Sequence, residues 1–310
     1  MKNMRIPLII VVSVAVLGIV LGSFFDLQIS SAIASPTSVL GLTISAICPT
    51  LGFAGVAVMG GGFIALAVHG KYPLGLKIMF YVLAACCYGV AVCYPAGEYF
   101  GVNGFYGAAP KWMGYLIVIL PEAAAMAGGY FLFKDCENKN MWIVFVVIVG
   151  LLLLALLGVI PRLKDFVRRP RYRLVSKGDV AFHNWWQPCR NYKDLMVEFG
   201  IESSDDFKSY PSGHTAETSI LLVVSVFFPM AHKKFAKYQL PMFLASCGLV
   251  LLVAFARILA AAHYLSDVST GAFVIAFLLL IANEVLMRIK AVQLNEEPEQ
   301  QEEPKEQPAE

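Results

Sequence analysis

Apolar residues form long uninterrupted stretches along this 310-residue chain, and polar residues gather between them. A helix needs roughly 20 apolar residues to cross a bilayer, and eight stretches approach that length. They predict spanning helices over residues 6–25, 50–68, 78–94, 112–133, 141–160, 215–229, 240–262 and 268–287. We therefore expect an all-α fold, a polytopic membrane bundle of about eight transmembrane helices.

Composition agrees with a membrane environment. The chain is 58% hydrophobic and 15% charged, with a mean hydropathy of +0.68, which is too apolar for one water-soluble core. The net charge of +2 gives no indication of nucleic-acid binding, and we expect none. The seven cysteines contain no C-x-x-C pair, so we expect neither a disulfide framework nor a metal site.

The first apolar stretch follows a short basic segment and has the pattern of a secretion signal or of a permanent span. We favour the span, because residues 6–25 are long for a signal core and the A-x-A-like site at 32–34 lies well past their end. The mildly polar residues 26–49 then predict a loop that contains an interfacial helix.

Loop charges predict the orientation of the bundle. Lys and Arg gather in the short loops 71–77, 134–139 and 231–239, which fall on the cytoplasmic side if the N-terminus does. The chain then divides into N-terminal spans (1–160), a core (161–290) that begins with an extracytoplasmic loop over 161–214, and a disordered, acidic cytoplasmic tail (291–310). This topology predicts a multi-pass protein of the cell membrane with both termini inside.

Three polar motifs fall at the outer face of that topology. The first contains Arg162 and Arg169, the second is Pro211-Ser212-Gly213-His214, and the third runs from Arg257 to Asp267. Their residue types suit phosphate chemistry. Guanidinium groups bind phosphate oxygens in pairs, and a Ser-Gly turn that opens a helix presents backbone N–H groups to an anion.

The same motifs contain groups that can make and break bonds. His214 and His263 titrate near neutral pH, so one can attack phosphorus while the other protonates a leaving oxygen. Asp267 lies four residues after His263, and on a helix that spacing brings a carboxylate beside an imidazole.

These motifs resemble those of the type 2 phosphatidic acid phosphatase superfamily, whose pattern is K-x6-R-P, then P-S-G-H, then S-R-x5-H-x3-D. The resemblance covers roughly residues 161–267 and the flanking spans. It implies a metal-independent membrane phosphatase without cofactors that acts on a lipid phosphate or diphosphate through a phosphohistidine. Carried over, it implies the nucleophile His263, the general acid His214 and the orienting Asp267, with phosphate held by Arg162, Arg169, Ser212, Gly213 and Arg257.

The chain departs from this pattern at two positions. Arg162 stands where the family has Lys, which leaves Lys164 as an alternative, and Ala256 stands where the family has Ser. An Arg is a planar fork rather than a point charge, and an Ala lacks a hydroxyl donor. Neither change removes a group that makes or breaks bonds.

Several further polar residues have two interpretations each. Glu217 faces the site or caps its helix. Arg168, Arg171 and Arg173 contact either substrate or lipid headgroups, and headgroups are the commoner partners. For the remaining positions we favour a structural interpretation over a functional one; they are the interfacial Trp185, Trp186 and His232, and Glu122, which lies within a predicted span.

The sequence therefore predicts an enzyme that removes phosphate from a lipid at the outer leaflet. The competing hypothesis is a non-catalytic anionic-lipid-binding protein or transporter, for which the Arg residues suffice and His263 with Asp267 are superfluous. Undecaprenyl diphosphate, phosphatidate and phosphatidylglycerol phosphate present the same terminal phosphate, so the sequence leaves the substrate open. It also leaves the oligomeric state open.

Overall fold

The computed structural model describes residues 4–99, 111–136, 138, 140–227 and 233–288. Helices make up the regular structure of these residues, which confirms the all-α prediction. The helices are α1 (Arg5–Ile33), α2 (Val39–His69), α3 (Leu74–Tyr99), α4 (Lys111–Phe133), α5 (Met141–Leu153), α6 (Ile160–Val167), α7 (Tyr172–Val175), α8 (Tyr192–Glu198), α9 (Gly213–Ser219), α10 (Leu221–Phe227), α11 (Gln239–Leu259) and α12 (Leu265–Arg288). The predicted tail and His232 lie outside the described residues.

Seven helical stretches of the described chain are long and apolar enough to cross a membrane. They contain α1, α2, α3, α4, α5 with α6, α11 and α12. The predicted span over 215–229 is represented by α9 and α10, two shorter helices that meet at Ile220. The polytopic membrane bundle is thus confirmed.

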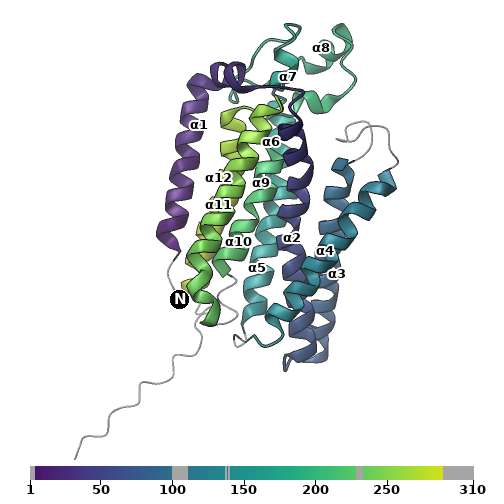
Figure 1. Ribbon diagram of the computed structural model, residues 1–310, viewed down its shortest axis with the longest axis vertical. Coiled ribbons are helices and arrows are strands. Elements are labelled where there is room, and N and C mark those ends of the chain that lie inside the picture. Colours follow the sequence, from purple (N-terminus) through teal and green to yellow (C-terminus); the bar gives the residue numbers. More distant parts are fainter. Residues whose placement is uncertain (1–3, 100–110, 137, 139, 228–232, 289–310) are drawn as a thin grey trace, which may run out of the picture.

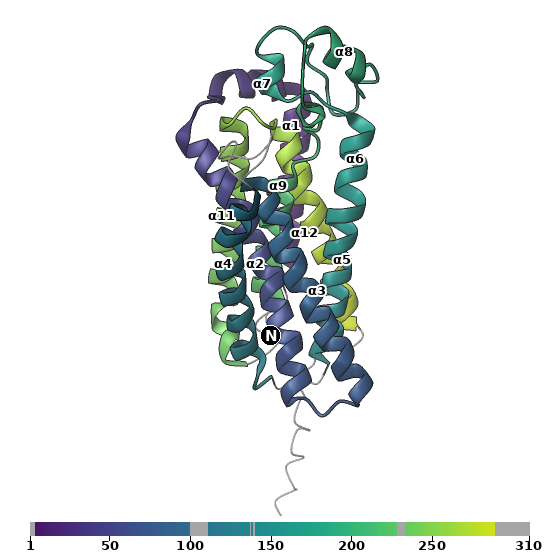
Figure 2. The same ribbon diagram turned by 90° about the vertical axis from the view of Figure 1, so that its right-hand side faces the viewer.

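The long helix α2 occupies the centre of the bundle (Figures 1 and 2). It packs against α3 and α4 on one side and against α9 and α11 on the other, while α1 packs against α12. Two glycines allow the closest contacts around α9. A Cβ on Gly52 of α2 would lie 2.3 Å from the Glu217 carbonyl oxygen, and one on Gly271 of α12 would lie 2.4 Å from that of Ser212. The short helix α9 is therefore held tightly between α2 and α12.

The outer surface of the bundle is apolar. On α1, Ile6 is 69% exposed, Leu17 56% and Phe24 72%, and comparable side chains project from the other spans. Such a surface would destabilise a protein in water, but it suits contact with lipid chains.

The predicted loop over residues 26–49 is wrong, because the structure has helices over most of these residues. Helix α1 continues to Ile33 and α2 begins at Val39, so a short turn replaces the loop. Asp26 weakened the apolar pattern there, but it is buried and paired with Arg169. Ser38 caps the start of α2 by accepting a hydrogen bond from the Gly41 N–H, and the nearly uncharged residues that follow remain helical.

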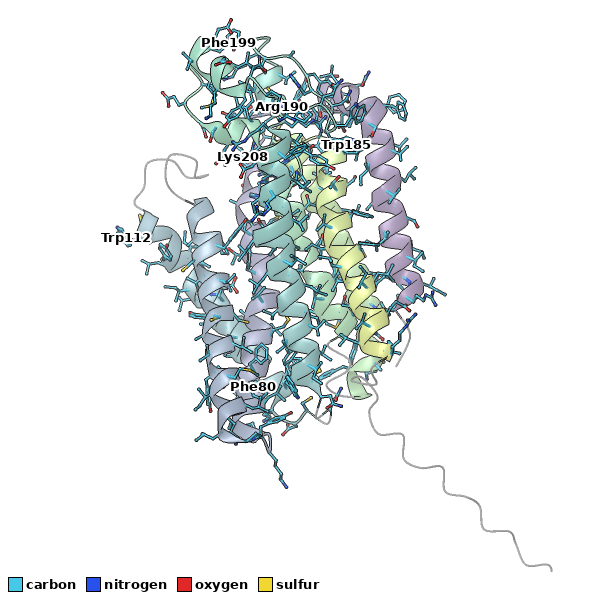
Figure 3. The ribbon with its side chains drawn as sticks, turned by 180° about the vertical axis from the view of Figure 1, so that it is seen from behind. Phe80, Trp112, Trp185, Arg190, Phe199 and Lys208 are labelled. Atoms are coloured by element: carbon cyan, nitrogen blue, oxygen red, sulfur yellow. The ribbon has the colours of Figure 1, made fainter. Side chains whose placement is uncertain are left out.

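One end of the bundle is covered by residues 168–211, which we call the cap (Figures 1 and 3). The cap contains α7 and α8 and has a small core made by Leu174, Val180, Cys189 and Phe207. Figure 3 shows Trp185, Arg190, Phe199 and Lys208 at this end, with Phe80 near the other. The start of α1 and the end of α12 lie at the end of the bundle opposite the cap (Figure 1).

Candidate active site

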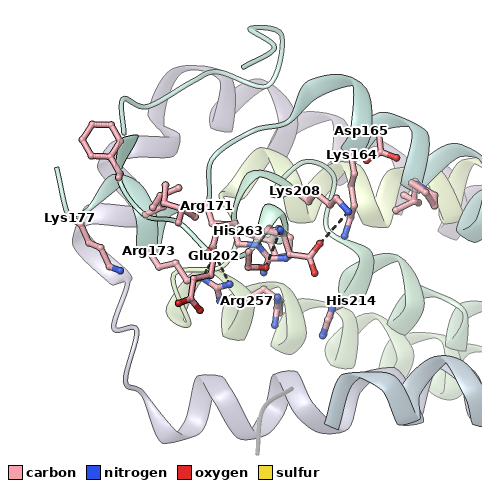
Figure 4. Close-up of a pocket in the computed structure, with 18 of the residues that line it drawn as sticks. Lys164, Asp165, Arg171, Arg173, Lys177, Glu202, Lys208, His214, Arg257 and His263 are labelled. Carbon is pink, nitrogen blue, oxygen red and sulfur yellow. Dashed lines mark hydrogen bonds and ion pairs between the residues drawn. The ribbon is translucent and has the colours of Figure 1, made fainter. Parts of the chain in front are cut away.

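A cavity of about 780 Å³ lies between the cap and the bundle (Figure 4). Side chains from all three sequence motifs reach it, although the motifs are separated by up to about a hundred residues. Its inner part is lined by Lys164, Arg171, His214, Glu217, Arg257 and His263, and its outer part carries further charged residues of the cap.

The loop between α11 and α12 holds His263 in a fixed orientation. The Arg257 carbonyl accepts hydrogen bonds from the backbone N–H groups of Ala262 and His263, at 3.1 and 3.2 Å. Ala261 adopts a left-handed conformation with φ of 55°, which turns the chain sharply between the two helices. His263 is only 1% exposed, so its position is set by the backbone around it.

The tautomer of His263 follows from its contacts. Its Nδ1 lies 2.6 Å from the carbonyl oxygen of Ser209. A carbonyl only accepts hydrogen bonds, so Nδ1 carries the proton and Nε2 keeps a lone pair. Burial also holds the pKa of His263 well below its usual value of 6.5, and Arg257 and Arg171 lower the pKa further, against the opposing effect of Asp267. His263 is thus a neutral imidazole with one nucleophilic nitrogen.

Asp267 supports His263 less directly than its spacing predicts. Its Oδ2 lies 3.7 Å from His263 Nδ1, beyond hydrogen-bond distance. The same oxygen accepts hydrogen bonds from the Ser209 hydroxyl and from the Tyr264 N–H. Asp267 therefore fixes Ser209 and Tyr264, which both contact or adjoin His263. Ser209 in turn presents the carbonyl that orients the His263 ring.

His214 lies in the first turn of α9 and is 8% exposed to the cavity. Ser212 caps this helix, because its Oγ accepts from both the N–H and the hydroxyl of Thr215. The positive charges of Arg257, Lys164 and Arg171 act on the His214 ring. A bound anion would offset these charges and favour the protonated form of His214.

The basic residues come from three different elements. Lys164 projects from α6, and its Nζ would lie 3.3 Å from a Cβ on Gly213, where a Glu217 oxygen also approaches to 3.2 Å. Arg257 is buried in the last turn of α11. Arg171 is braced by a 2.8 Å hydrogen bond from its Nε to the Asp205 carbonyl. Figure 4 shows Lys164, Arg171 and Arg257 around His263 and His214.

Arg162 and Arg169 do not line this cavity, contrary to the sequence expectation. Arg162 is exposed on α6. Arg169 is fully buried and pairs with two carboxylates, with its Nη1 2.6 Å from Asp267 and its Nη2 2.9 Å from Asp26. For Arg162 the reason is helix geometry, because residues two apart on α6 point to nearly opposite sides, and of these two basic residues only Lys164 lines the cavity. Arg169 lies beyond Arg168, where a left-handed conformation ends α6.

The sequence contained a signal for the residues that do line the cavity. Lys164 and Arg171 are separated by six residues, as in the family's first motif, although Tyr172 rather than Pro follows. Ser212 and Gly213 do not line the cavity either, whereas Glu217 does. The expected residues that line it are thus His214, His263, Arg257, Lys164 and Glu217.

Other polar residues considered above pair with residues other than the histidines, except Glu122, whose carboxylate oxygens have no hydrogen-bond partner in the described part of the chain. Arg168 pairs with Asp165 at 2.6 Å, and Arg173 lines the outer cavity while pairing with Asp206 at 2.7 Å. Trp185 donates to the Ser23 hydroxyl of α1 at 3.0 Å. Glu122 is buried in α4 and does not line the cavity.

Within the described residues, no cluster of three or more His, Cys, Asp or Glu side chains is arranged to hold a metal ion.

The model of the PAP2 superfamily matches residues 140–289, which contain α5 to α12 and the whole cap. No curated protein and no solved structure matches the chain.

Proposed function

Residues 140–289 of this chain belong to the PAP2 superfamily, which indicates a phosphatase that acts on phosphate esters, and we propose that the substrate is a lipid phosphate or diphosphate. The membrane-spanning bundle supports a lipid, because the cavity opens between the cap and helices that lie in the bilayer. The observation that carries the proposal is the 2.6 Å contact between His263 Nδ1 and the Ser209 carbonyl. It leaves Nε2 as a nucleophile beside three cations.

The first step is attack of His263 Nε2 on phosphorus. A P–N bond forms and the P–O bond to the lipid breaks, while Lys164, Arg171 and Arg257 balance the charge of the phosphate oxygens. His214 gives its proton to the leaving oxygen, so the lipid departs as an alcohol, or as a monophosphate if the substrate is a diphosphate. Throughout this step the Nδ1 proton stays on the His263 ring and is hydrogen bonded to the Ser209 carbonyl.

The second step restores the enzyme. Neutral His214 takes a proton from water, the oxygen of which attacks phosphorus, and the P–N bond breaks. Inorganic phosphate leaves and His263 returns to its initial tautomer. Lys164 and Arg171 replace Arg162 and Arg169 in this mechanism, because the former pair lines the cavity and the latter does not.

The orientation predicted from loop charges places this chemistry at the outer leaflet of the cell membrane. The cap covers the cavity end of the bundle, opposite the start of α1 and the end of α12 (Figure 1). We propose that the cap is extracytoplasmic and that both ends of the chain are cytoplasmic.

The test is phosphate release by purified protein from undecaprenyl diphosphate, phosphatidate and phosphatidylglycerol phosphate in mixed micelles. His263→Ala should abolish release from every substrate that the wild type hydrolyses. The matched control is His69→Ala, since His69 is exposed and bonds Tyr130 rather than lining the cavity. Release that persists in His263→Ala would refute the phosphohistidine mechanism.

Two further outcomes separate the alternatives. Binding of these lipids by wild-type protein without any phosphate release would favour the lipid-binding or transport hypothesis. The proposed mechanism uses protein groups alone, so activity should survive a chelator, and loss of activity that added divalent cations restore would contradict it.

A further inference from the structure

We propose that Asp26 of α1 is a positioning residue for the nucleophile His263, and that it acts through Arg169. This inference rests on the proposed function. Asp26 lies outside the matched segment and does not line the cavity. Its side chain is 1% exposed in a helix long and apolar enough to cross a membrane, and a buried carboxylate is costly unless it is paired.

Asp26 completes a buried polar network. One of its oxygens accepts hydrogen bonds from Arg169 Nη2 at 2.9 Å and from the Ser266 hydroxyl. The other accepts from the Ser266 backbone N–H at 2.9 Å. Asp26 thus binds the first turn of α12 as well as Arg169, and the positive end of the helix dipole favours a carboxylate at that place.

Arg169 connects Asp26 to the catalytic loop. Its Nη1 donates to Asp267 Oδ1 at 2.6 Å and to the Ser266 hydroxyl at 2.8 Å. Its Nε donates to the His183 carbonyl at 2.8 Å, and its guanidinium stacks 4.1 Å from the centre of the Tyr264 ring. The planar fork is therefore held at each of its nitrogens, and loss of the Asp26 carboxylate would release Nη2 from its charged partner.

The last link runs from Asp267 to the imidazole. Asp267 Oδ2 holds the Ser209 hydroxyl and the Tyr264 N–H, and the Ser209 carbonyl holds His263 Nδ1. A rotation of Arg169 that moves Asp267 would therefore move the carbonyl that orients His263. In-line attack requires accurate placement, and a misplacement of about 1 Å costs on the order of a hundredfold in rate.

A second contact ties the same part of α1 to the cap. Trp185 donates to Ser23 at 3.0 Å and stacks on Tyr210, with ring centres 5.5 Å apart. The end of α1 nearest the cap is thus bonded on one side to the cap and on the other to α12. We infer that α1 is part of the catalytic unit although it precedes the matched segment by more than a hundred residues.

Asp26→Asn is the informative substitution. Asparagine keeps the size and one acceptor oxygen of Asp26 but loses its charge. Arg169 and Asp267 remain as a neutral pair, so the variant does not leave an isolated buried charge. We expect kcat to fall about 10- to 100-fold, as for other residues that orient a catalytic group from behind. Because Asp26 does not line the cavity, KM should stay within about twofold.

The matched control is Glu284→Gln. Glu284 pairs with Arg5 at 3.4 Å and so joins the same two helices, α1 and α12, at their other ends. This variant should keep the kcat and KM of the wild type. If Asp26→Asn keeps a kcat within about twofold of wild type, or if Glu284→Gln loses as much, the proposal is overturned.

A double variant distinguishes positioning from a structural role. In a Ser209→Ala background the hydroxyl link from Asp267 to Ser209 is already lost while Arg169 keeps Asp267 as its partner, so adding Asp26→Asn should lower kcat by less than it does in the wild type while still lowering Tm. Losses in kcat that multiply would show that Asp26 acts independently of the Ser209 hydroxyl and would overturn the proposed path.

A second readout does not require phosphatase activity. Diethyl pyrocarbonate acylates neutral imidazole nitrogen, and peptide mass spectrometry can follow His263 relative to the exposed His69 in the same protein. Asp26→Asn should slow acylation of His263 severalfold and leave His69 unchanged. An unchanged rate at His263 would overturn the positioning role even if no lipid substrate had been found, whereas an inactive wild type with a slowed Asp26→Asn variant would count against the proposed function alone.

Discussion

Two residues of α6 provide a sharp test of which cations bind phosphate. Arg162 and Lys164 are two positions apart on one helix, and both are basic. Lys164 lines the cavity, whereas Arg162 is exposed and does not. Lys164→Ala and Arg162→Ala remove one positive charge each from the same turn of helix. The two variants therefore share their effect on net charge and differ in the face that they change.

The size of the effect can be worked from the contact that is lost. A hydrogen bond to a charged group contributes about 1.5–3 kcal/mol, and about 1.4 kcal/mol corresponds to a factor of ten. Lys164→Ala should therefore lower kcat/KM by about 10- to 150-fold. Arg162→Ala is an exposed substitution and should change kcat/KM by no more than about twofold, which corresponds to about 0.5 kcal/mol.

The assay is the initial rate of phosphate release as a function of the mole fraction of lipid substrate in mixed micelles. Circular dichroism and size-exclusion profiles of both variants should match those of the wild type. Lys164→Arg serves as a further variant, because it keeps the charge and should recover part of the activity. If Arg162→Ala loses tenfold or more while Lys164→Ala stays near wild type, then Arg162 rather than Lys164 binds phosphate and the assignment of Lys164 is refuted.

The glycine contacts and the buried histidine give two more predictions. Gly271→Ala would bring a Cβ to 2.4 Å from the Ser212 carbonyl oxygen and should lower both Tm and activity by moving α9. Gly248→Ala in α11 would place its Cβ in open space, with no neighbouring side chain within 4 Å, and should be neutral or add about 0.5–1 kcal/mol of stability. Equal Tm values for the two variants would contradict the packing argument. The folded-state pKa of His263 lies below its usual value of 6.5. As the pH falls below 6.5, the unfolded chain therefore takes up a proton at this residue that the folded protein does not. The free energy of unfolding should decrease by up to about 1.4 kcal/mol for each pH unit of acidification. Thermal unfolding between pH 7 and pH 5 should show this fall in the wild type and a smaller one in His263→Gln, and identical slopes would refute it.

Much of the fold could be read from the sequence because lipid leaves few alternatives for an apolar chain. A backbone in the bilayer must satisfy its own hydrogen bonds, so long apolar stretches such as residues 141–160 predict helices without knowledge of their neighbours. The predicted loop over residues 26–49 is wrong because this stretch contains Asp26, and its helix is possible because Arg169, 143 positions later, pairs with that charge. No local pattern contains this information.

The candidate site likewise has features that the sequence determines and features that only the packing of the helices determines. The sequence by itself determined the chemistry: two histidines, a carboxylate four residues after one of them, and a choice of basic residues, all in motifs whose spacing resembles one superfamily. Only the tertiary structure decided which basic residues face the cavity, because that depends on the rotation of α6 against α9 and on the left-handed turn at Arg168 that ends α6. It likewise decided that Arg169 faces two carboxylates and that the Ser209 carbonyl, rather than Asp267, accepts the hydrogen bond from the His263 Nδ1–H. Helical periodicity is local and is written in the sequence, whereas the pairing of Asp26 with Arg169 joins distant segments and exists only once the helices have packed.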